Sequence, residues 1–349
     1  MNARYIDYVL KFKKPAGTSR GTLTEKTTYF LIIEDEGKTG VGEANLFRGL
    51  SADDVPEYGK VLSDVCRSIS RYGRNFRTAL TEYPSIRFAV EQAFLSLDGS
   101  GRFILFPSAF TGGKDKIPIN GLIWMGDIDD MKRQIRRKLD AGYRVLKLKI
   151  GALNFDDECA LIASIRKSFS PADLEIRVDA NGAFTPGEAL EKLKKLSEYS
   201  LHSIEQPIRQ GQWEEMARLC EQSPLPIALD EELIGLFDAM ERRKLIQSIR
   251  PQYLILKPSL LGGFEATRQW IDLAGDMGAG WWITSALESN IGLNAIAQFT
   301  YTLQSPMVQG LGTGGLFTNN IPSPLYLEGS GLGYNPSGKW GFEEVLFPL

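Results

Sequence analysis

The chain has 349 residues, of which 43% are hydrophobic and 24% are charged, and its formal net charge at pH 7 is -3. This length suits a barrel of about 200–250 residues with an appended domain better than one small domain. The near-balanced charge gives no reason to expect a nucleic-acid or membrane partner, and no apolar run approaches the roughly 18–20 residues of a membrane span. The N-terminus lacks the apolar core of a signal peptide, so we expect a cytoplasmic protein.

Residues 1–115 are predicted to form an α+β capping domain. Apolar and polar residues alternate in YIDYVLKFK and TTYFLIIED, which predicts antiparallel strands. Apolar positions at helical spacing predict helices within 51–73 and 85–99.

Two polar, glycine-bearing loops of this domain, near 14–26 and 43–54, are expected to act as lids. Arg20 and Arg48 in these loops are either contacts for a carboxylate of the substrate or solvated loop residues. The segment 111–116 is predicted to be a linker to the next domain.

From about residue 117 the pattern changes to alternating strands and helices, which is typical of a parallel barrel. The barrel domain is predicted over 116–320, with seven helices joining its strands. Its eight strands are predicted near 118–125, 144–150, 175–180, 202–206, 226–230, 253–257, 281–285 and 308–312. The tail at 321–349 is rich in Pro and Gly and is expected to return to the capping domain.

Five charged residues recur at nearly constant spacing, each at the end of a short apolar run. They are Lys149, Asp179, Glu205, Asp230 and Lys257, at steps of 30, 26, 25 and 27 residues. Each step is about one βα unit, so in a barrel these side chains meet at the mouth formed by the carboxyl ends of the strands. The pattern predicts a divalent metal site flanked by acid/base lysines.

The three carboxylates are the predicted metal ligands. Taken singly, Asp179, Glu205 and Asp230 are equally well explained as helix caps. Taken together, three converging anionic groups without a cation would be very unfavourable. Hard oxygen ligands with no nearby Cys or His favour Mg²⁺.

Strand alternation in VLKLKIG (145–151) places Lys147 and Lys149 on one face and the apolar residues on the other. Both lysines are therefore expected to point into the barrel, where each would lower the pKa of the other and so favour a base near neutral pH. The alternative is that they are exposed on an edge strand. Lys257 is expected across the barrel, so that a flat substrate would have a lysine on each face.

The only histidine, His202, lies at the start of LHSIEQP and is expected on the face opposite Glu205, in a structural role. A Ser-His-Asp triad, a zinc site with several imidazoles or a histidine acid/base pair would each need this residue. The chemistry is therefore assigned to lysines and carboxylates.

The segments after the last two predicted strands carry candidate substrate contacts. TSALESN supplies Ser285, Glu288 and Ser289, and the glycine-rich GLGTGG supplies Gly312 and Thr313. Successive backbone N–H groups of such a glycine-rich stretch can face an anionic group.

Together these features resemble the enolase superfamily, and the resemblance covers essentially the whole chain. It implies an α/β fold, namely a modified (β/α)7β TIM barrel with an N-terminal α+β capping domain completed by the C-terminal tail. It also implies abstraction of the proton α to a carboxylate with the help of Mg²⁺, for which Mn²⁺ can substitute. The K-x-K on strand two and the lone lysine on strand six resemble the muconate lactonizing enzyme group.

Within that group, VDANGAF, EQP, ALDE, LKPSLLGG and SALESNIGLNAIAQ most resemble the o-succinylbenzoate synthases. The resemblance implies a small anionic carboxylate substrate and a syn dehydration in menaquinone biosynthesis. Residue by residue, the carboxylates at 179, 205 and 230 match the metal ligands, Lys149 the base and Lys257 the lysine opposite. Lys147 matches the lysine that helps to hold the substrate carboxylate. Positions next to the ligands or the substrate are matched by Asn181, Glu231 and Arg177.

N-succinylamino acid racemases and dipeptide epimerases share nearly all of these motifs and stay as alternatives. The epimerases usually carry an Asp-x-Asp pair after strand eight to grip an amine, whereas GLGTGG contains no acid, which argues against an amino-group substrate. A non-catalytic barrel that binds a small molecule would have no use for the five charged positions. A homo-oligomer is compatible with the sequence.

Overall fold

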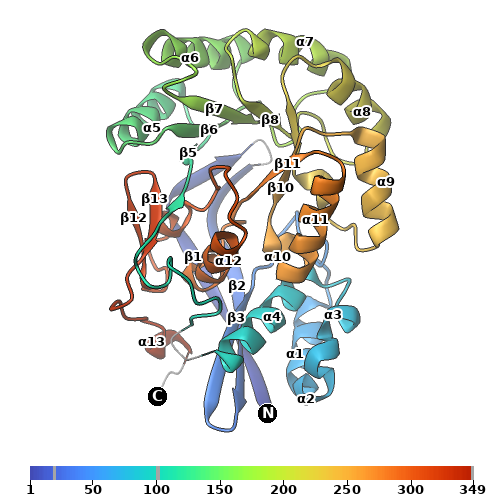
Figure 1. Cartoon of the computed structure of the whole chain (residues 1–349), viewed down its shortest axis with the longest axis vertical. Coiled ribbons are helices and arrows are strands. Elements are labelled where there is room, and N and C mark those ends of the chain that lie inside the picture. The colour runs from blue at the N-terminus through green and yellow to red at the C-terminus, as the bar shows by residue number, and fades with distance from the viewer. Residues whose placement is uncertain (19–20, 100–102, 347–349) are drawn as a thin grey trace.

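The computed structural model describes residues 1–18, 21–99 and 103–346 (Figure 1). Its N-terminal sheet is an antiparallel meander of β1 (Asn2–Thr18), β2 (Gly21–Asp35) and β3 (Lys38–Ala44), as predicted. The predicted loop at 14–26 is wrong, because β1 and β2 continue through most of it as one long hairpin. A register shift between Lys11 and Ala16 lets the polar segment stay in the ladder.

Helices cover one face of this sheet. They are α1 (Tyr58–Arg67), α2 (Ile69–Tyr72), α3 (Phe76–Ala79) and α4 (Pro84–Asp98), with a 3-10 turn at Gly73–Asn75. Two glycines of β3 explain how closely α4 packs: a Cβ on Gly40 would lie 2.1 Å from the Ala93 carbonyl oxygen, and one on Gly42 would lie 2.0 Å from that of Ala89.

The second sheet consists of seven parallel strands in the order β11-β10-β9-β8-β7-β6-β5. They are β5 (Gly121–Ile123), β6 (Val145–Lys149), β7 (Glu175–Asp179), β8 (Ser203–Glu205), β9 (Ile227–Leu229), β10 (Tyr253–Leu256) and β11 (Gly280–Ile283). Seven of the eight predicted strands are therefore present in the described ranges.

The eighth predicted strand, near 308–312, is reduced to two bridging residues. Gln309 bridges Ile119 on one side, and Gly310 bridges Thr284 on the other, so this segment links the two edges of the curled sheet. A Cβ at Gly310 would lie 2.5 Å from Oγ1 of Thr284, which explains the glycine. Glycine-rich sequence pairs weakly as a strand, and the segment turns away after these two contacts.

Seven helices follow the strands and lie outside the sheet, as Figure 1 shows most clearly for α5 to α9. They are α5 (Ile128–Asp140), α6 (Phe155–Ser168), α7 (Pro186–Ser197), α8 (Trp213–Gln222), α9 (Ala239–Ile249), α11 (Phe264–Asp276) and α12 (Asn290–Thr302). A short helix, α10 (Pro258–Leu261), directly follows β10. Among the described residues, no helix has the length and apolar character needed to cross a membrane.

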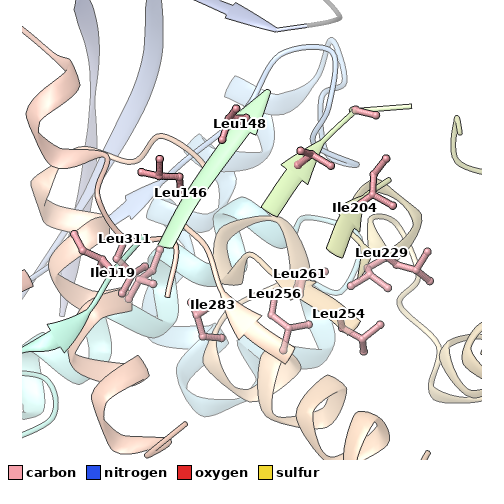
Figure 2. Close-up of a cluster of buried hydrophobic side chains, with 14 of the residues drawn as sticks. Ile119, Leu146, Leu148, Ile204, Leu229, Leu254, Leu256, Leu261, Ile283 and Leu311 are labelled. Carbon is pink, nitrogen blue, oxygen red and sulfur yellow. The ribbon is translucent and has the colours of Figure 1, made fainter. Parts of the chain in front are cut away.

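Apolar side chains between strands and helices form the main core. Leu146 and Leu148 of β6 are fully buried in it, and Figure 2 shows them with leucines of β10 in the same cluster. Since side chains alternate along a strand, the intervening Lys147 and Lys149 point to the interior of the curled sheet.

The C-terminal tail contacts both parts of the molecule. Its hairpin, β12 (Leu325–Glu328) and β13 (Gly331–Tyr334), pairs with β4 (Ile117–Pro118) at the start of the barrel sequence. After the hairpin comes α13 (Glu343–Leu346), whose last carbonyl oxygen accepts a hydrogen bond from Arg4 Nη2 on β1 at 2.7 Å. The tail thus returns to the N-terminal sheet, while its strands pair elsewhere.

Candidate active site

The strand register brings the predicted charged residues to one end of the sheet. Lys149 pairs with Asp179, and Asp179 pairs with Glu205, on three neighbouring strands. Asp230 directly follows β9, and Lys257 directly follows β10. All five are buried, with at most 9% of each residue exposed. The convergence that the spacing predicts is therefore present.

Ammonium groups and carboxylates alternate across this end of the barrel. Lys147 Nζ lies 2.8 Å from Asp179 Oδ2 and 2.5 Å from Glu205 Oε2. Lys149 Nζ lies 2.7 Å from the same Asp179 oxygen, and Lys257 forms an ion pair with Asp230. Three lysines thus neutralise three carboxylates that would otherwise be costly to bury.

The carboxylates raise the pKa of the lysines they face. Burial alone would lower the pKa of Lys147, but Asp179, Glu205 and Asp230 raise it above its ordinary value. The expected lowering by a second lysine is therefore wrong for Lys147, because three anionic neighbours outweigh it. The pKa of Lys257 is raised in the same way, against burial and chiefly by Asp230.

The lysines in turn lower the pKa of two of the carboxylates, Asp179 and Asp230. Burial would raise the pKa of Asp179, but the ammonium groups of Lys147 and Lys149 hold it well below its usual range. The pKa of Asp230 is likewise lowered, against burial and mainly by Lys257. Both groups are therefore ionised ligand candidates at neutral pH.

Glu205 differs from the other two carboxylates and suits a bound cation. Burial, together with the charge of Asp179, raises its pKa well above the usual range. Its Oε1 is buried and has no hydrogen-bond partner among the described residues. Lys147 Nζ lies between Glu205 and Asp179, where a cation would neutralise both.

The donor set thus fits a hard divalent ion, since it offers three buried carboxylates and one unpaired oxygen. The side chains are not gathered into a closed cage: in the part of the chain that the structure describes, no three acidic, cysteine or histidine residues approach closely enough for that. Glu205, Asp179 and Asp230 each turn an oxygen toward a lysine instead.

Polar residues directly after the strands hold these groups in place. Asn181 accepts a hydrogen bond from Lys149 Nζ at 2.7 Å and donates to Glu231 Oε1 at 3.0 Å. Gln206 accepts from the backbone N–H of Asp230 at 3.1 Å. Both Asn181 and Gln206 have a positive φ, 45° and 40°, an uncommon conformation that often marks functional sites. Gln206 was missed from the sequence, although the EQP motif contains it.

Burial lowers the pKa of Arg177 and the charges of Glu175 and Glu205 oppose that shift, so Arg177 lies near Glu205, although in the described residues its ion pair is with Glu175. Its Nε pairs with Glu175 at 2.6 Å, its Nη1 donates to the Val308 carbonyl oxygen, and its guanidinium lies 4.1 Å from the centre of the Trp282 ring. Arg177 lies two residues before Asp179 on β7, so both side chains point to the interior of the sheet. Strand alternation alone could not tell which of them lies at the end of the strand.

His202 lies at the start of β8 and away from Glu205 at its end. Its ring packs 4.8 Å from that of Tyr253 and 6.0 Å from that of Trp282, and burial lowers its pKa. It packs on these rings rather than on a helix, which supports a structural role.

A cavity of about 80 Å³ lies over the charged cluster. Its lining includes five predicted substrate contacts, which are Lys147, Asn181, Ser285, Gly312 and Thr313, as well as Lys149 and Lys257. Ser285 Oγ and Thr313 Oγ1 lie 2.5 Å apart and form one hydroxyl pair in the wall. Phe47 and Leu50 close the cavity from the loop after β3, and Leu122 and Trp124 line it beside β5. These four apolar positions had no distinguishing signal in the sequence.

Four other candidate contacts are placed elsewhere or lie beyond the described residues. Glu288 and Ser289 are fully buried and do not line the cavity. Instead, Ser289 donates through N and Oγ to Glu43 at 2.9 and 2.6 Å. Arg48 is exposed and pairs with Asp54 at 2.5 Å within its own loop, which supports the solvated reading. Arg20 falls outside the described residues.

Comparison with known proteins identifies the family. Residues 130–317 match the family described as enolase C-terminal domain-like. The chain is 53% identical to an o-succinylbenzoate synthase of Desulfotalea psychrophila, over 95% of this chain and 99% of the relative. The chain belongs to the enolase superfamily. The crystal structure of MenC from the same organism superimposes with a TM-score of 0.86 at 49% identity, covering 95% of this chain and 99% of that one.

A racemase is among the more distant relatives. An N-succinylamino acid racemase of Thermus thermophilus is 29% identical over 83% of this chain and 78% of its own length. The superfamily resemblance and the fold that it implies, a capping domain on a barrel of parallel strands, are therefore confirmed.

Proposed function

We propose that this protein is an o-succinylbenzoate synthase. It converts 2-succinyl-6-hydroxy-2,4-cyclohexadiene-1-carboxylate to o-succinylbenzoate and water, a step of menaquinone biosynthesis. The observation that carries the proposal is that Lys149 and Lys257 line one small cavity above three buried carboxylates, in a chain 53% identical to such a synthase.

In the first step Lys149 Nζ, in its neutral form, accepts the proton α to the ring carboxylate. The electron pair of the broken C–H bond moves toward that carboxylate, where the Lys147 ammonium faces the growing negative charge. Asp179, Glu205 and Asp230 would hold Mg²⁺, and the bound ion would supply further positive charge for the same anion.

In the second step the bond from the ring to the hydroxyl oxygen breaks. The electron pair held at the carboxylate returns to form the new double bond of the ring, and the pair of the C–O bond leaves with the oxygen. The proton on Lys149 passes to that oxygen on the same face of the ring, so water leaves and Lys149 becomes neutral again. The product ring is aromatic, so the demand on the protein falls mainly on the first step. Lys257 remains an ammonium group, paired with Asp230, and stabilises the intermediate electrostatically from the opposite face.

The succinyl group is assigned to the wall formed by Ser285, Gly312 and Thr313. The two hydroxyl groups and the glycine-rich backbone offer hydrogen-bond donors, and residues 310–315 contain no acidic side chain that would repel a carboxylate. An amino-group substrate would lack a counter-ion in this wall.

The test is Mg²⁺-dependent loss of the cyclohexadiene absorbance with purified protein, run beside N-succinyl amino acids and dipeptides. Rapid conversion of the diene supports the synthase. A second candidate is an N-succinylamino acid racemase, favoured by the two lysines facing one cavity and by the Thermus thermophilus relative. Racemisation without dehydration would replace the first proposal with the second.

A further inference from the structure

Asn45 connects the N-terminal sheet to the barrel at a single side-chain amide. It directly follows β3, is fully buried, and begins the loop whose Phe47 and Leu50 close the cavity. Its Oδ1 accepts a hydrogen bond from Lys26 on β2. Its Nδ2 reaches three groups of the barrel: Ser259 Oγ at 3.2 Å, the Ala286 carbonyl oxygen at 3.0 Å and Glu288 Oε1 at 3.1 Å.

Two of these groups belong to segments that form the cavity. Ser259 lies in the first turn of α10, which begins directly after Lys257, and the Lys257 carbonyl oxygen accepts hydrogen bonds from Leu260 N and Leu261 N. Ala286 itself lines the cavity. Asn45 therefore contacts both the helix that starts at Lys257 and the wall beside it.

Glu288 connects α10 to the segment around Ala286 on the side away from the cavity. Its Oε1 accepts a hydrogen bond from Ser259 Oγ at 2.5 Å, and its Oε2 accepts one from the backbone N–H of Ala286 at 2.7 Å. Glu288 and Ser259 are both fully buried, so water cannot replace these contacts. The amide of Asn45 is the link from this pair to the N-terminal sheet.

The two faces of the cavity are held in different ways. Lys147 and Lys149 lie within β6, and Lys149 is fixed by pairing with Asp179 on β7. Lys257 lies beyond the paired part of β10, whose last partner is Leu256 opposite Ile283. The position of the Lys257 backbone therefore depends on α10 and on what α10 contacts, while its ammonium group pairs with Asp230.

We propose that Asn45 is a positioning residue that sets Lys257 against the face of the substrate opposite Lys149. This inference rests on the proposed function, in which Lys257 faces the anionic intermediate. Displacement of a catalytic group by about 1 Å is enough to lower a rate on the order of a hundredfold.

The experiment is a double-mutant cycle on the synthase reaction. Asn45→Ala is expected to lower kcat roughly tenfold to a hundredfold, with KM changed by less than about threefold. In a Lys257→Ala background the same substitution is expected to lower kcat by less than about twofold, because the group that it positions is gone. An equal loss in both backgrounds would mean that Asn45 supports the fold and not Lys257.

Glu91→Gln is the matched control at the same interface. Glu91 is a buried residue of α4 whose carboxylate accepts hydrogen bonds from Phe264 N at 2.6 Å and Glu265 N at 3.4 Å, at the start of α11. It is expected to lower Tm while leaving kcat within about twofold. If Glu91→Gln had the same Tm as Asn45→Ala and lost as much kcat, the proposal would be overturned. Ser259→Ala removes the same link from the barrel side, and should reproduce the kcat loss if Asn45→Ala does not fold.

Amide hydrogen exchange gives a readout that needs no turnover. Exchange at Leu260 and Leu261, whose N–H groups bond to the Lys257 carbonyl oxygen, is expected to accelerate in Asn45→Ala and not in Glu91→Gln. Exchange over 145–149 is expected to stay unchanged in both. If the wild-type protein does not dehydrate the diene, the proposed function fails, while unchanged exchange at Leu260 and Leu261 would refute the positioning role by itself.

Discussion

Lys149 Nζ lies 2.7 Å from Oδ2 of Asp179, its direct partner on the neighbouring strand. The same oxygen is 2.8 Å from Lys147 Nζ, so the proposed base and the lysine before it share one carboxylate oxygen with the proposed metal site. Any cation that engages Asp179 competes with both lysines for that oxygen. A metal ion bound through this oxygen would therefore replace the ion pairs that Lys147 and Lys149 form with it.

Glu205→Gln tests the metal site without relying on turnover. The substitution removes a buried carboxylate whose pKa is raised by burial and by Asp179, so the metal-free protein is expected to keep its Tm or gain a few degrees. Millimolar Mg²⁺ is expected to raise the Tm of the wild type, and this rise is expected to disappear in Glu205→Gln. Thermal unfolding with and without Mg²⁺ measures both. A wild-type Mg²⁺ response preserved in Glu205→Gln would exclude Glu205 as a ligand.

Glu288 gives a prediction for stability against pH. Burial raises its pKa from 4.5 to about 7, with Glu43 adding to the rise and Ser259 and Lys26 opposing it. Because the folded pKa is the higher one, its contribution to stability is present in full below pH 4.5 and is lost as pH rises through about 7. The difference between the folded and the unfolded pKa corresponds to a change of at most about 3 kcal/mol in the free energy of unfolding.

Glu288→Gln is therefore expected to cost more stability at pH 5 than at pH 7.5, as measured by urea unfolding at both values. Burial also raises the pKa of Asp53, to about 6, so Asp53 makes stability fall with rising pH in the same way. Asp53→Asn is therefore the comparison variant. Glu288→Gln is expected to keep the share of the pH dependence of stability that comes from Asp53. Parallel stability profiles for wild type and Glu288→Gln would show that Glu288 keeps an ordinary pKa.

Because α4 lies so close to β3, two glycine-to-alanine substitutions are expected to differ in their effect on stability. Gly42→Ala would place a Cβ 2.0 Å from the Ala89 carbonyl oxygen and is expected to cost about 2 kcal/mol or more. Gly59→Ala, in the first turn of α1, meets nothing within 4 Å and is expected to be neutral or to stabilise by up to about 1 kcal/mol. Urea denaturation compares the two. Equal effects would contradict the tight packing described for β3.

The charged cluster was predictable because local rules determine it. Alternation turns Lys147 and Lys149 inward, and the repeated βα step brings Asp179, Glu205 and Asp230 to the same rim. These rules act within single strands and need no knowledge of how the N-terminal sheet sits on the barrel.

The failures came where long-range packing decides. Glu288 and Ser289 follow β11 as a substrate contact would, but Asn45 and Glu43 of the N-terminal region bind them from the other side. The segment 14–26 is polar and rich in turn-forming residues, yet its described residues 14–18 and 21–26 belong to the two strands of the long ladder.

The most direct test of the account is the rate at which wild-type protein and Lys149→Ala remove the cyclohexadiene absorbance at saturating Mg²⁺. We expect rapid loss for the wild type and a kcat lower by about 10³-fold or more for Lys149→Ala, because the substitution removes the proposed proton acceptor while the neighbouring Lys147, whose pKa is raised by its carboxylate partners, stays protonated. Tm for the variant is measured in parallel to show that it is folded. Substantial dehydration by folded Lys149→Ala would contradict the assignment of Lys149 as the base.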